Sequence, residues 1–450
     1  MGKDKLPIPS RACHHSLRHT HCQTIRPIRI AMKNPILCAL ATTALHQAAF
    51  AQAPASFENP VVLRAPDLIP ADWMQGPSHR VREQVVTDGF MAHFTIDTDF
   101  GSFEAAGVPE VRRRIVETNA IRKLTDTSKG DLFAEGMKRS IERPIDAVKN
   151  IVSHPVDSVK QAPKTVGHFF SKIGSSIERS ANRIKQEQES GTEVSTSETA
   201  GRVNETMKRV AGFDKARLDT ARQLGVDPYS DNQRLQDEID TVTWAFFAGG
   251  LPLRIGAAVV SAGVAVTATN LVGVPEDAYA HTQSELALMD AQSLTAMGVR
   301  EADIKAFQIQ PTLSTTRRHR IVKSLEVLSH AKGRGNIVLL ANSCETTAQA
   351  DFLVAALSML GTRQQSGAAD YVELKVFGRL PGAVTAAGVL EVPAPVDHVT
   401  WTEQVAGFAQ RDDLGSTAKV LIHTGKFSPA TEAGFAAAGW KTEAIGYPEK

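Results

Sequence analysis

The sequence predicts a mixed α+β protein that is mainly helical and is divided into several units. Three observations predict this class: strand-like alternation with turn signals near the N-terminus, helical spacing of apolar residues through the middle, and alternating strand and helix patterns near the C-terminus. We expect an N-terminal β-hairpin unit, a central helical region with an apolar helical hairpin, and a small C-terminal α/β domain with a βαβ unit. A chain of 450 residues is long enough for about two to four domains.

Residues 1–51 are expected to comprise an upstream extension and a signal peptide at 32–51. Lys33 gives this segment a positive start, and an apolar, Ala-rich run covers 35–50. The end of the run, Ala49-Phe50-Ala51, fits the small-x-small pattern of a cleavage site. The arrangement resembles a bacterial secretory signal peptide.

This resemblance implies export to the periplasm or cell envelope, with a mature chain that begins at Gln52. The sequence leaves open whether Met1 or Met32 is the translation start, because cleavage removes everything before Gln52 in either case. Cleavage also removes three of the four cysteines and the histidines near them, so we do not interpret that group as a metal site. Cys344 is then the one remaining thiol, and an intrachain disulfide is excluded.

Residues 52–130 are expected to form a small unit of β-hairpins and one helix. Apolar and polar residues alternate between Val81 and Phe103, and Asp88-Gly89 is a strong hairpin signal. Pro109 is typical of the first turn of a helix, and apolar residues recur after it at helical spacing. This unit has no catalytic pattern.

Residues 131–185 are predicted to be a basic amphipathic helical arm. The motif Pro144-Ile145-Asp146-Ala147-Val148-Lys149 is echoed by Pro155-Val156-Asp157-Ser158-Val159-Lys160, eleven residues later. Eleven residues make three turns at ~3.67 residues per turn, so the apolar stripe stays on one side. Between residues 111 and 185 there are 16 Lys or Arg against 8 Asp or Glu, although the whole chain has a formal net charge of only +1.

Basic amphipathic helices separated by prolines resemble lipid-surface segments such as those of apolipoproteins. The resemblance is one of pattern, and it implies an anionic membrane surface as the partner. An envelope protein is the other partner that we consider, and the alternative is that the stripe packs on the protein itself. Nucleic acid is not expected, because no aromatic and basic binding motif is present. The residues expected on this surface are Lys138, Arg139, Arg143, Lys149, Lys160, Lys164, Phe169, Phe170 and Lys172.

Residues 186–205 are polar and are predicted to be a linker. Residues 206–332 are expected to be a helical domain, and one of its helices begins at Thr315 and contains Arg317-Arg318-His319-Arg320. Gly298 is a stop signal between two of these helices.

The apolar hairpin at 244–274 has Arg254 as its single ionisable residue. Gly249-Gly250-Leu251-Pro252 predicts a break between a first helix that ends near Ala248 and a second that begins near Leu253. The length admits membrane insertion, whereas the content of Gly, Ala, Thr and Asn favours a buried pair of core helices. Both interpretations stay open. Membrane insertion of the hairpin would make the protein a membrane-inserting effector.

Residues 333–450 are expected to form the α/β domain. Its predicted strands are the apolar run 336–341, residues 371–377 with 388–392 as partner, 419–423 and 440–445, and its predicted helices are 346–360 and 429–438. The succession of strand, helix and strand after residue 419 is typical of a βαβ unit.

The expected function is non-enzymatic, with neither a cofactor nor a metal. The sequence lacks a nucleophile elbow, a phosphate loop and a His-Glu-x-x-His motif. The alternative is a thiol or hydrolytic enzyme that uses Cys344 together with His398 or His423, since a helix N-terminus next to a cysteine lowers the thiol pKa. The sequence identifies no substrate, no specific partner and no oligomeric state.

Overall fold

The computed structural model is mixed α+β and mainly helical, which confirms the predicted fold class. The residues that it describes belong to one compact unit, Ala55–Lys450. They are residues 57–142, 212–253, 255, 273–415 and 418–446.

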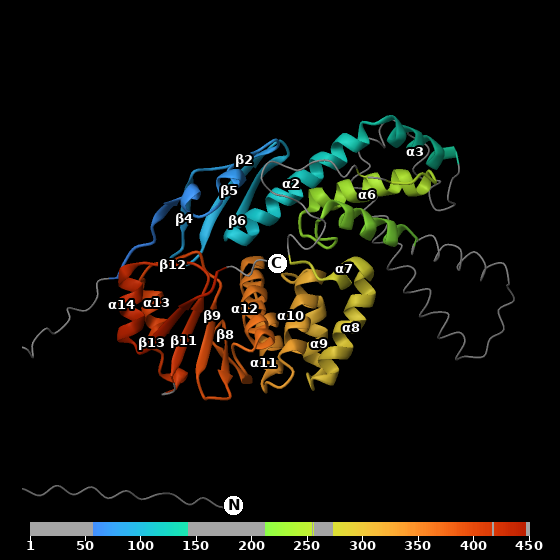
Figure 1. The fold of residues 1–450 in the computed structure, drawn as a ribbon. Coiled ribbons are helices and arrows are strands. Elements are labelled where there is room, and N and C mark those ends of the chain that lie inside the picture. Colours follow the sequence, from blue (N-terminus) through green and yellow to red (C-terminus); the bar gives the residue numbers. More distant parts are fainter. Residues whose placement is uncertain (1–56, 143–211, 254, 256–272, 416–417, 447–450) are drawn as a thin grey trace, which may run out of the picture. The chain divides into compact units, whose positions relative to one another are not determined.

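The N-terminal sheet has six antiparallel strands (Figure 1). One edge of β5 pairs with β6, and the other edge pairs with β4 and β3, which in turn pair with β1 and β2. The strands are β1 (Val62–Arg64), β2 (Gln75–Gly76), β3 (His79–Val81), β4 (Gln84–Thr87), β5 (Ala92–Thr98) and β6 (Gly101–Ala106), with short 3-10 helices η1 (Ala65–Asp67) and η2 (Ala71–Trp73) among them. The alternation between Val81 and Phe103 did not indicate β1 and β2, which lie before it and are too short to give a periodic signal.

The hairpin predicted at Asp88-Gly89 is confirmed and joins β4 to β5. The Asp88 carboxylate accepts the backbone N–H groups of Phe90 (3.1 Å) and Met91 (2.8 Å). Gly89 has a φ of 104°, a conformation that side chains with a Cβ rarely adopt. The sequence signal therefore had the expected physical basis.

Helix α2 (Val108–Ser128) follows β6 and has Pro109 in its first turn, as predicted. Its first half packs Val111 and Ile115 against the N-terminal sheet. Its second half packs Ile121 and Leu124 into a separate cluster with helix α6. One helix thus connects the sheet to the central helical region.

Three helices form this central group: α3 (Asp131–Glu142), residues 212–224, and α6 (Gln233–Ala248). Helix α6 ends at Ala248, which confirms the first half of the predicted hairpin. Most of the predicted second half, residues 254 and 256–272, lies outside the described residues. Of the helices that the structure describes, none combines the length and the hydropathy that a membrane span requires.

The next six helices are α7 (Glu276–Ala280), α8 (Gln283–Ala296), α9 (Glu301–Ile309), α10 (Thr315–Val327), α11 (Arg334–Asn342) and α12 (Thr347–Ser366). Helix α10 packs between α8 and α12 (Figure 1). A single hydrophobic cluster runs from Leu294 on α8 to Ala383 in the C-terminal sheet, and so it crosses the predicted boundary at residue 333.

The apolar run 336–341, predicted as a strand, is helical and forms most of α11. It begins after Gly333, whose φ of 84° provides the left-handed turn into the helix. Ile337, Val338 and Ala341 are fully buried in the hydrophobic cluster. A short apolar run that is buried on several sides has no periodicity that separates helix from strand, and tertiary packing decided the outcome.

The C-terminal sheet has the strand order β13-β11-β9-β8-β7. The strands are β7 (Tyr371–Phe377), β8 (Leu380–Thr385), β9 (Leu390–Ala394), β11 (Lys419–His423) and β13 (Trp440–Ala444), and α14 (Pro429–Ala437) connects the last two. Strands β9, β11 and β13 are parallel, so the predicted βαβ unit is confirmed. The remaining elements are β10 (His398–Val399), β12 (Lys426–Phe427), α13 (Glu403–Ala409) and η4 (Asp412–Leu414).

One pairing was predicted wrongly: β7 pairs with β8 and not with the strand near 388–392. A two-residue turn that contains Gly378, with a φ of 65°, reverses the chain directly into β8. Pro381 and Gly382 lie inside β8, and both residue types are depleted in strands. Their presence concealed the strand in the sequence.

Candidate functional site

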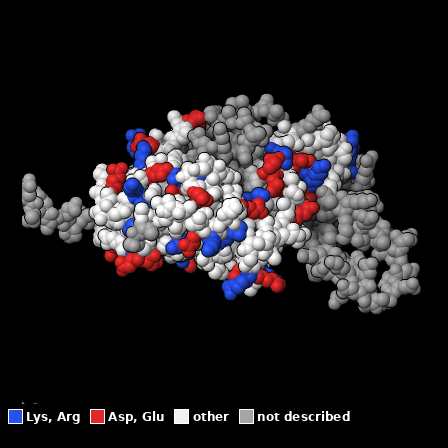
Figure 2. Space-filling model, turned by 60° about the horizontal axis from the view of Figure 1, so that its bottom comes forward, with Lys and Arg blue, Asp and Glu red and all other residues white. Residues whose placement is uncertain are grey.

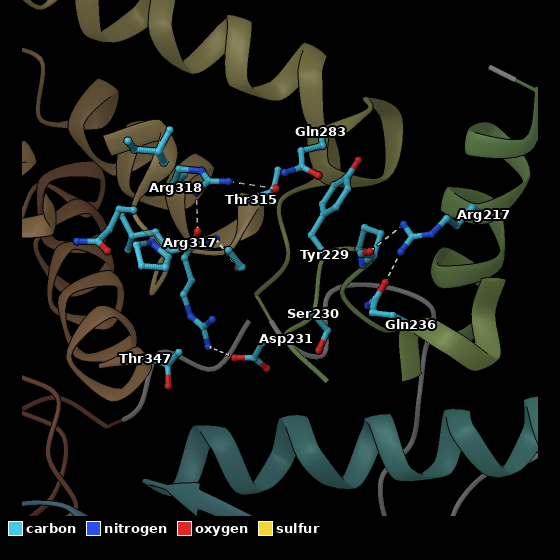
Figure 3. Close-up of a pocket in the computed structure, with 16 residues that line it drawn as sticks. Arg217, Tyr229, Ser230, Asp231, Gln236, Gln283, Thr315, Arg317, Arg318 and Thr347 are labelled. Atoms are coloured by element: carbon cyan, nitrogen blue, oxygen red, sulfur yellow. Dashed lines mark hydrogen bonds and ion pairs between the residues drawn. The ribbon is translucent and has the colours of Figure 1, made fainter. Parts of the chain in front are cut away.

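A cavity of about 460 Å³ opens at the N-terminal end of α10 (Figure 3). Its walls are the 228–231 loop, the segment between α9 and α10, and the first residues of α8 and α12. Three arginines line it: Arg217, Arg317 and Arg318. Since enzymes and binding proteins use concave sites with few convergent polar groups, this cavity is the candidate site of the described chain.

Arg317 is 4% exposed and is fully engaged by carboxylates. Its Nε and Nη2 atoms donate to the two oxygens of Asp351 at 2.7 and 2.9 Å, and Nη2 also donates to Asp231 at 2.9 Å. Bidentate pairing of this kind fixes the guanidinium in place. Arg317 is therefore a structural cation in the wall of the cavity.

Asp231 and Asp351 also form ion pairs with arginines of α2. Arg114 donates to Asp231 at 3.0 Å, and Arg113 lies 3.3 Å from Asp351. Burial raises the pKa of the Asp231 carboxyl, but the three arginines outweigh it and lower that pKa to about 2. We call these five residues the ionic cluster: Arg113, Arg114, Asp231, Arg317 and Asp351. The cluster connects α2 to α10 and α12.

Glu117 of α2 extends the ionic cluster toward the cavity loop. Its carboxylate accepts hydrogen bonds from Arg114 (2.8 Å), Ser230 (2.5 Å) and Asn232 (2.9 Å). Asn232 is in turn the N-cap of α6 and accepts the N–H of Leu235. The loop that forms one wall of the cavity is thus fixed by α2 from behind.

Arg318 differs from its neighbour although both lie in the first turn of α10. Its Nη1 donates to the carbonyl of Leu313 at 2.7 Å, and its Nη2 approaches the hydroxyl of Thr315 at 3.5 Å. Among the described residues no carboxylate lies within ion-pair distance of it. Burial lowers the pKa of Arg318, and the charge of Asp290 opposes this only partly. Its positive charge is left without a partner at the cavity wall.

The other arginine of the cavity, Arg217, is neutralised. It donates to Asp240 at 2.6 Å, to the carbonyl of Pro228 at 3.0 Å, and to the amide oxygen of Gln236. Figure 3 shows its guanidinium beside Gln236. Arg217 therefore fixes the 228–231 loop onto α6.

His319, the residue after Arg318, is buried between two carboxylates. Its Nδ1 lies 2.7 Å from Asp290 of α8, and its Nε2 lies 3.2 Å from Asp277 of α7. Burial lowers the pKa of His319, but the bonds to Asp290 and Asp277 outweigh it, so the pKa is raised. The imidazole ring of His319 thus connects α7, α8 and α10.

The residues of the predicted thiol site lie in different environments. Cys344 is 8% exposed in the hydrophobic cluster around α11, and its Sγ contacts the carbonyl of Leu340 at 3.7 Å. Burial raises the pKa of this thiol, which opposes the thiolate that a nucleophile requires. In the described part of the chain, no hydrogen bond joins Cys344 to His398 or His423.

The two histidines belong to the C-terminal sheet region. His423 ends β11, stacks on Phe427 at 3.9 Å, and bonds the carbonyl of Gly425 through Nδ1. His398 lies on β10, where it pairs with Lys426 of β12. Burial lowers the pKa of both histidines. These contacts are structural.

Asp397 has a structural role as well. It is 3% exposed, and its oxygens accept the backbone N–H groups of Ala92 at the start of β5 (2.9 Å) and of Val108 at the start of α2 (3.2 Å). A carboxylate at a helix N-terminus is stabilised by the helix dipole. Asp397 therefore fixes the N-terminal sheet to the chain just before β10.

Two of the predicted surface residues are described, and both lie on α3. Lys138 is exposed, and Arg139 donates to Glu135 at 2.8 Å. The remaining seven lie outside the described residues: Arg143, Lys149, Lys160, Lys164, Phe169, Phe170 and Lys172.

The described residues include no group of three or more His, Cys, Asp or Glu that is arranged to hold a metal ion. Comparison of the chain with protein-family models, with curated proteins and with solved structures found no match.

Proposed function

We propose that this chain is an exported, non-enzymatic protein of the bacterial envelope that binds an anionic membrane surface through residues 131–185. Two observations together carry the proposal. The first is the basic, proline-separated repeat at 144–160. The second is the way in which α3, the first helix of the arm, is held. Helix α3 presents Lys138 and Arg139 outward while its apolar side is fixed to the protein.

The attachment of α3 is close and depends on two glycines. A Cβ on Gly136 would lie 2.6 Å from the carbonyl oxygen of Ala245, and a Cβ on Gly249 would lie 2.7 Å from the Cα of Gly136. Phe133 and Met137 pack against the cluster that α2 and α6 share. At Met137, the apolar side of α3 thus packs on the protein itself.

The apolar segment 256–272 continues from the same helical group. Leu251, Leu253 and Ile255 pack against the cluster of α2 and α6, and the N–H of Ile255 is 3.3 Å from the side-chain oxygen of Gln223. Helix α3, at the start of the arm, and residues 251–255, which precede the apolar segment, therefore pack on the same set of helices.

On the face shown in Figure 2, the described surface has no large patch of Lys and Arg that would attract an anionic membrane as the arm is proposed to do. Lys and Arg side chains alternate there with Asp and Glu. Surface charges of mixed sign attract an anionic bilayer weakly, since the attraction depends on clustered basic groups. The arm, residues 131–185, contains ten Lys or Arg and six Asp or Glu, so it has a local excess of basic groups.

Export is tested by expressing the chain from Met32 in a bacterial host and sequencing the N-terminus of the fractionated protein. The proposal predicts periplasmic or envelope protein that begins near Gln52. Protein in the cytoplasm with residues 32–51 intact would contradict it.

Membrane binding is tested by flotation of the chain from Gln52 with vesicles of phosphatidylglycerol and phosphatidylcholine. Binding should increase with the anionic fraction and decrease with salt. Replacing Phe169 and Phe170 with Ser should weaken binding even at low salt, because the apolar contribution is lost.

The matched control replaces two exposed apolar residues of the N-terminal sheet region, Phe57 and Val62, with Ser. This variant should bind as the wild type does. A wild-type chain that ignores anionic vesicles at low salt would contradict the proposal and leave a protein partner as the other function of the arm.

A further inference from the structure

We propose that the cavity at the N-terminal end of α10 binds a small monocarboxylate with an apolar tail, and that Arg318 binds its carboxylate group. The cavity, the uncompensated guanidinium and an exposed apolar side chain at the rim together carry this inference. It is independent of the membrane arm.

The charges of the cavity wall identify the anionic subsite. Arg217 is paired with Asp240, and Arg317 is paired with Asp231 and Asp351. Arg318 is partly exposed and bonds only neutral acceptors among the described residues, Leu313 and Thr315. An arginine has five N–H donors, so several remain for a ligand oxygen. An incoming carboxylate would supply a counter-charge that the described residues do not supply.

The position of Arg318 adds a second source of attraction. Ser314 caps α10 by accepting the N–H of Arg317, and Thr315 is the first helical residue. The N-terminal end of a helix carries a partial positive charge that stabilises an anion beside it. Figure 3 shows Arg318, Thr315 and Gln283 on the same side of the cavity, so that a side-chain amide and a hydroxyl accompany the guanidinium.

The apolar tail has its own contact surface. Ile309 ends α9 with 81% of its area exposed, a large exposure for this residue type, and it lines the cavity. Pro311, which is also exposed, lines the cavity as a second apolar residue. Burial of apolar ligand atoms against these residues contributes free energy in proportion to the area covered.

The wall opposite Arg318 selects against a second negative charge. Asp231 lines the cavity with its carboxylate held by Arg317, and Figure 3 shows the two directed at one another. Asp231 and Arg317 compensate each other, so a second carboxylate on the ligand would lose its water there without gaining a counter-charge, which is costly. The cavity therefore favours one anionic group at one end of the ligand.

The experiment is isothermal titration of the full chain at low salt with hexanoate, hexanamide, acetate and adipate. Hexanoate should bind at least about tenfold more tightly than hexanamide, which has the same shape without the charge, because a hydrogen bond to a charged group is worth more than a neutral one. Acetate should bind more weakly for lack of the tail, and adipate more weakly because of its second charge.

Two variants assign the binding to this cavity. Arg318→Gln should weaken hexanoate binding about tenfold or more and abolish the preference over hexanamide, while Ile309→Ser should weaken hexanoate but not acetate. Arg300→Gln, which removes an exposed arginine paired with Asp303 outside the cavity, is the matched control and should bind hexanoate as the wild type does. Urea unfolding of Arg318→Gln in the absence of ligand verifies that the variant is folded.

Three results would overturn the proposal. The first is absence of saturable hexanoate binding to the wild type. The second is equal affinity for hexanoate and hexanamide. The third is unchanged hexanoate affinity in a folded Arg318→Gln variant.

Discussion

Arg317 and Arg318 are consecutive residues of one helix turn, and the structure uses them in opposite ways. Arg317 is buried and bound by two carboxylates, whereas Arg318 lies at the cavity wall and bonds a carbonyl and a hydroxyl. A buried cation with its partners fixes the packing of helices, and removing one partner leaves an uncompensated charge. A partly exposed cation without a carboxylate contributes little to folding and is available to a ligand. The two residues are of the same type, so their position relative to the neighbouring helices decides which one stabilises the fold and which one is available to a ligand.

The largest effect is expected from removing a partner of Arg317. Asp351→Asn leaves the buried Arg317 and the partly buried Arg113 with one carboxylate fewer, and we expect a loss of about 3 kcal/mol in the free energy of unfolding, the lower end for a buried pair because the Asp351 side chain is 37% exposed. Equilibrium urea unfolding measures it. The control is Asp126→Asn, because Asp126 pairs with Arg122 and Lys129 on the exposed side of α2 and such pairs contribute about 0–1 kcal/mol. Similar losses in both variants would remove the distinction between the ionic cluster and a surface ion pair.

A smaller change in the free energy of unfolding is expected at low pH. Because the folded-state pKa of Asp231 is lowered to about 2, its contribution is present above the unfolded value of ~3.9 and is lost as the pH falls through ~2. The contribution should be on the order of 2 kcal/mol at neutral pH. Urea unfolding at a series of pH values between ~5 and ~2 should show a steeper loss for the wild type than for Asp231→Asn. Parallel curves would contradict the assignment of this carboxylate to the ionic cluster.

The contribution of His319 to stability is expected to change as the pH rises. Its pKa is raised in the folded state, so its contribution is fully present below the unfolded value of 6.5 and is lost as the pH rises through the folded pKa. The difference in unfolding free energy between wild type and His319→Gln should therefore shrink with rising pH. Histidines with a lowered pKa, such as His423, act with the opposite sign and cancel in this difference. A difference that grows with pH would mean that His319 is neutral in the folded protein.

Local signals in the sequence predicted a large part of the fold. The strand patterns at 371–377 and 419–423 coincide with β7 and β11, and the helix after Pro109 begins where a proline fits the first turn. Strand β7 and helix α2 have a partly exposed face, and so polar residues interrupt their apolar ones at regular spacing, whereas β11 was predicted from a short apolar run. Segment 336–341 lacked such an alternation, and its helical structure depends on packing in the cluster around α12.

Local sequence signals could not identify the candidate site, because the residues that pair with one another there are distant in the sequence. Arg317 and Asp231 are 86 residues apart, and Arg114 and Asp231 are 117 apart. The sequence contained one clue, the basic run Arg317-Arg318-His319-Arg320 in a helix, because four successive positions point to different sides and cannot all face water. That clue signals buried charge, but the assignment of a partner to each residue requires the tertiary structure.

The most direct measurement of the central claim is urea unfolding of Arg317→Gln and Arg318→Gln, side by side in the same ligand-free buffer. The two variants lose the same charge from adjacent positions. We expect Arg317→Gln to lose about 3 kcal/mol, the lower end for a buried pair, because Asp351 and Asp231 each lose one arginine but are partly exposed and keep a second one. Arg318→Gln should change the free energy of unfolding by less than about 1 kcal/mol. Equal losses, or a larger loss for Arg318→Gln, would contradict the division between a structural and a ligand-binding arginine.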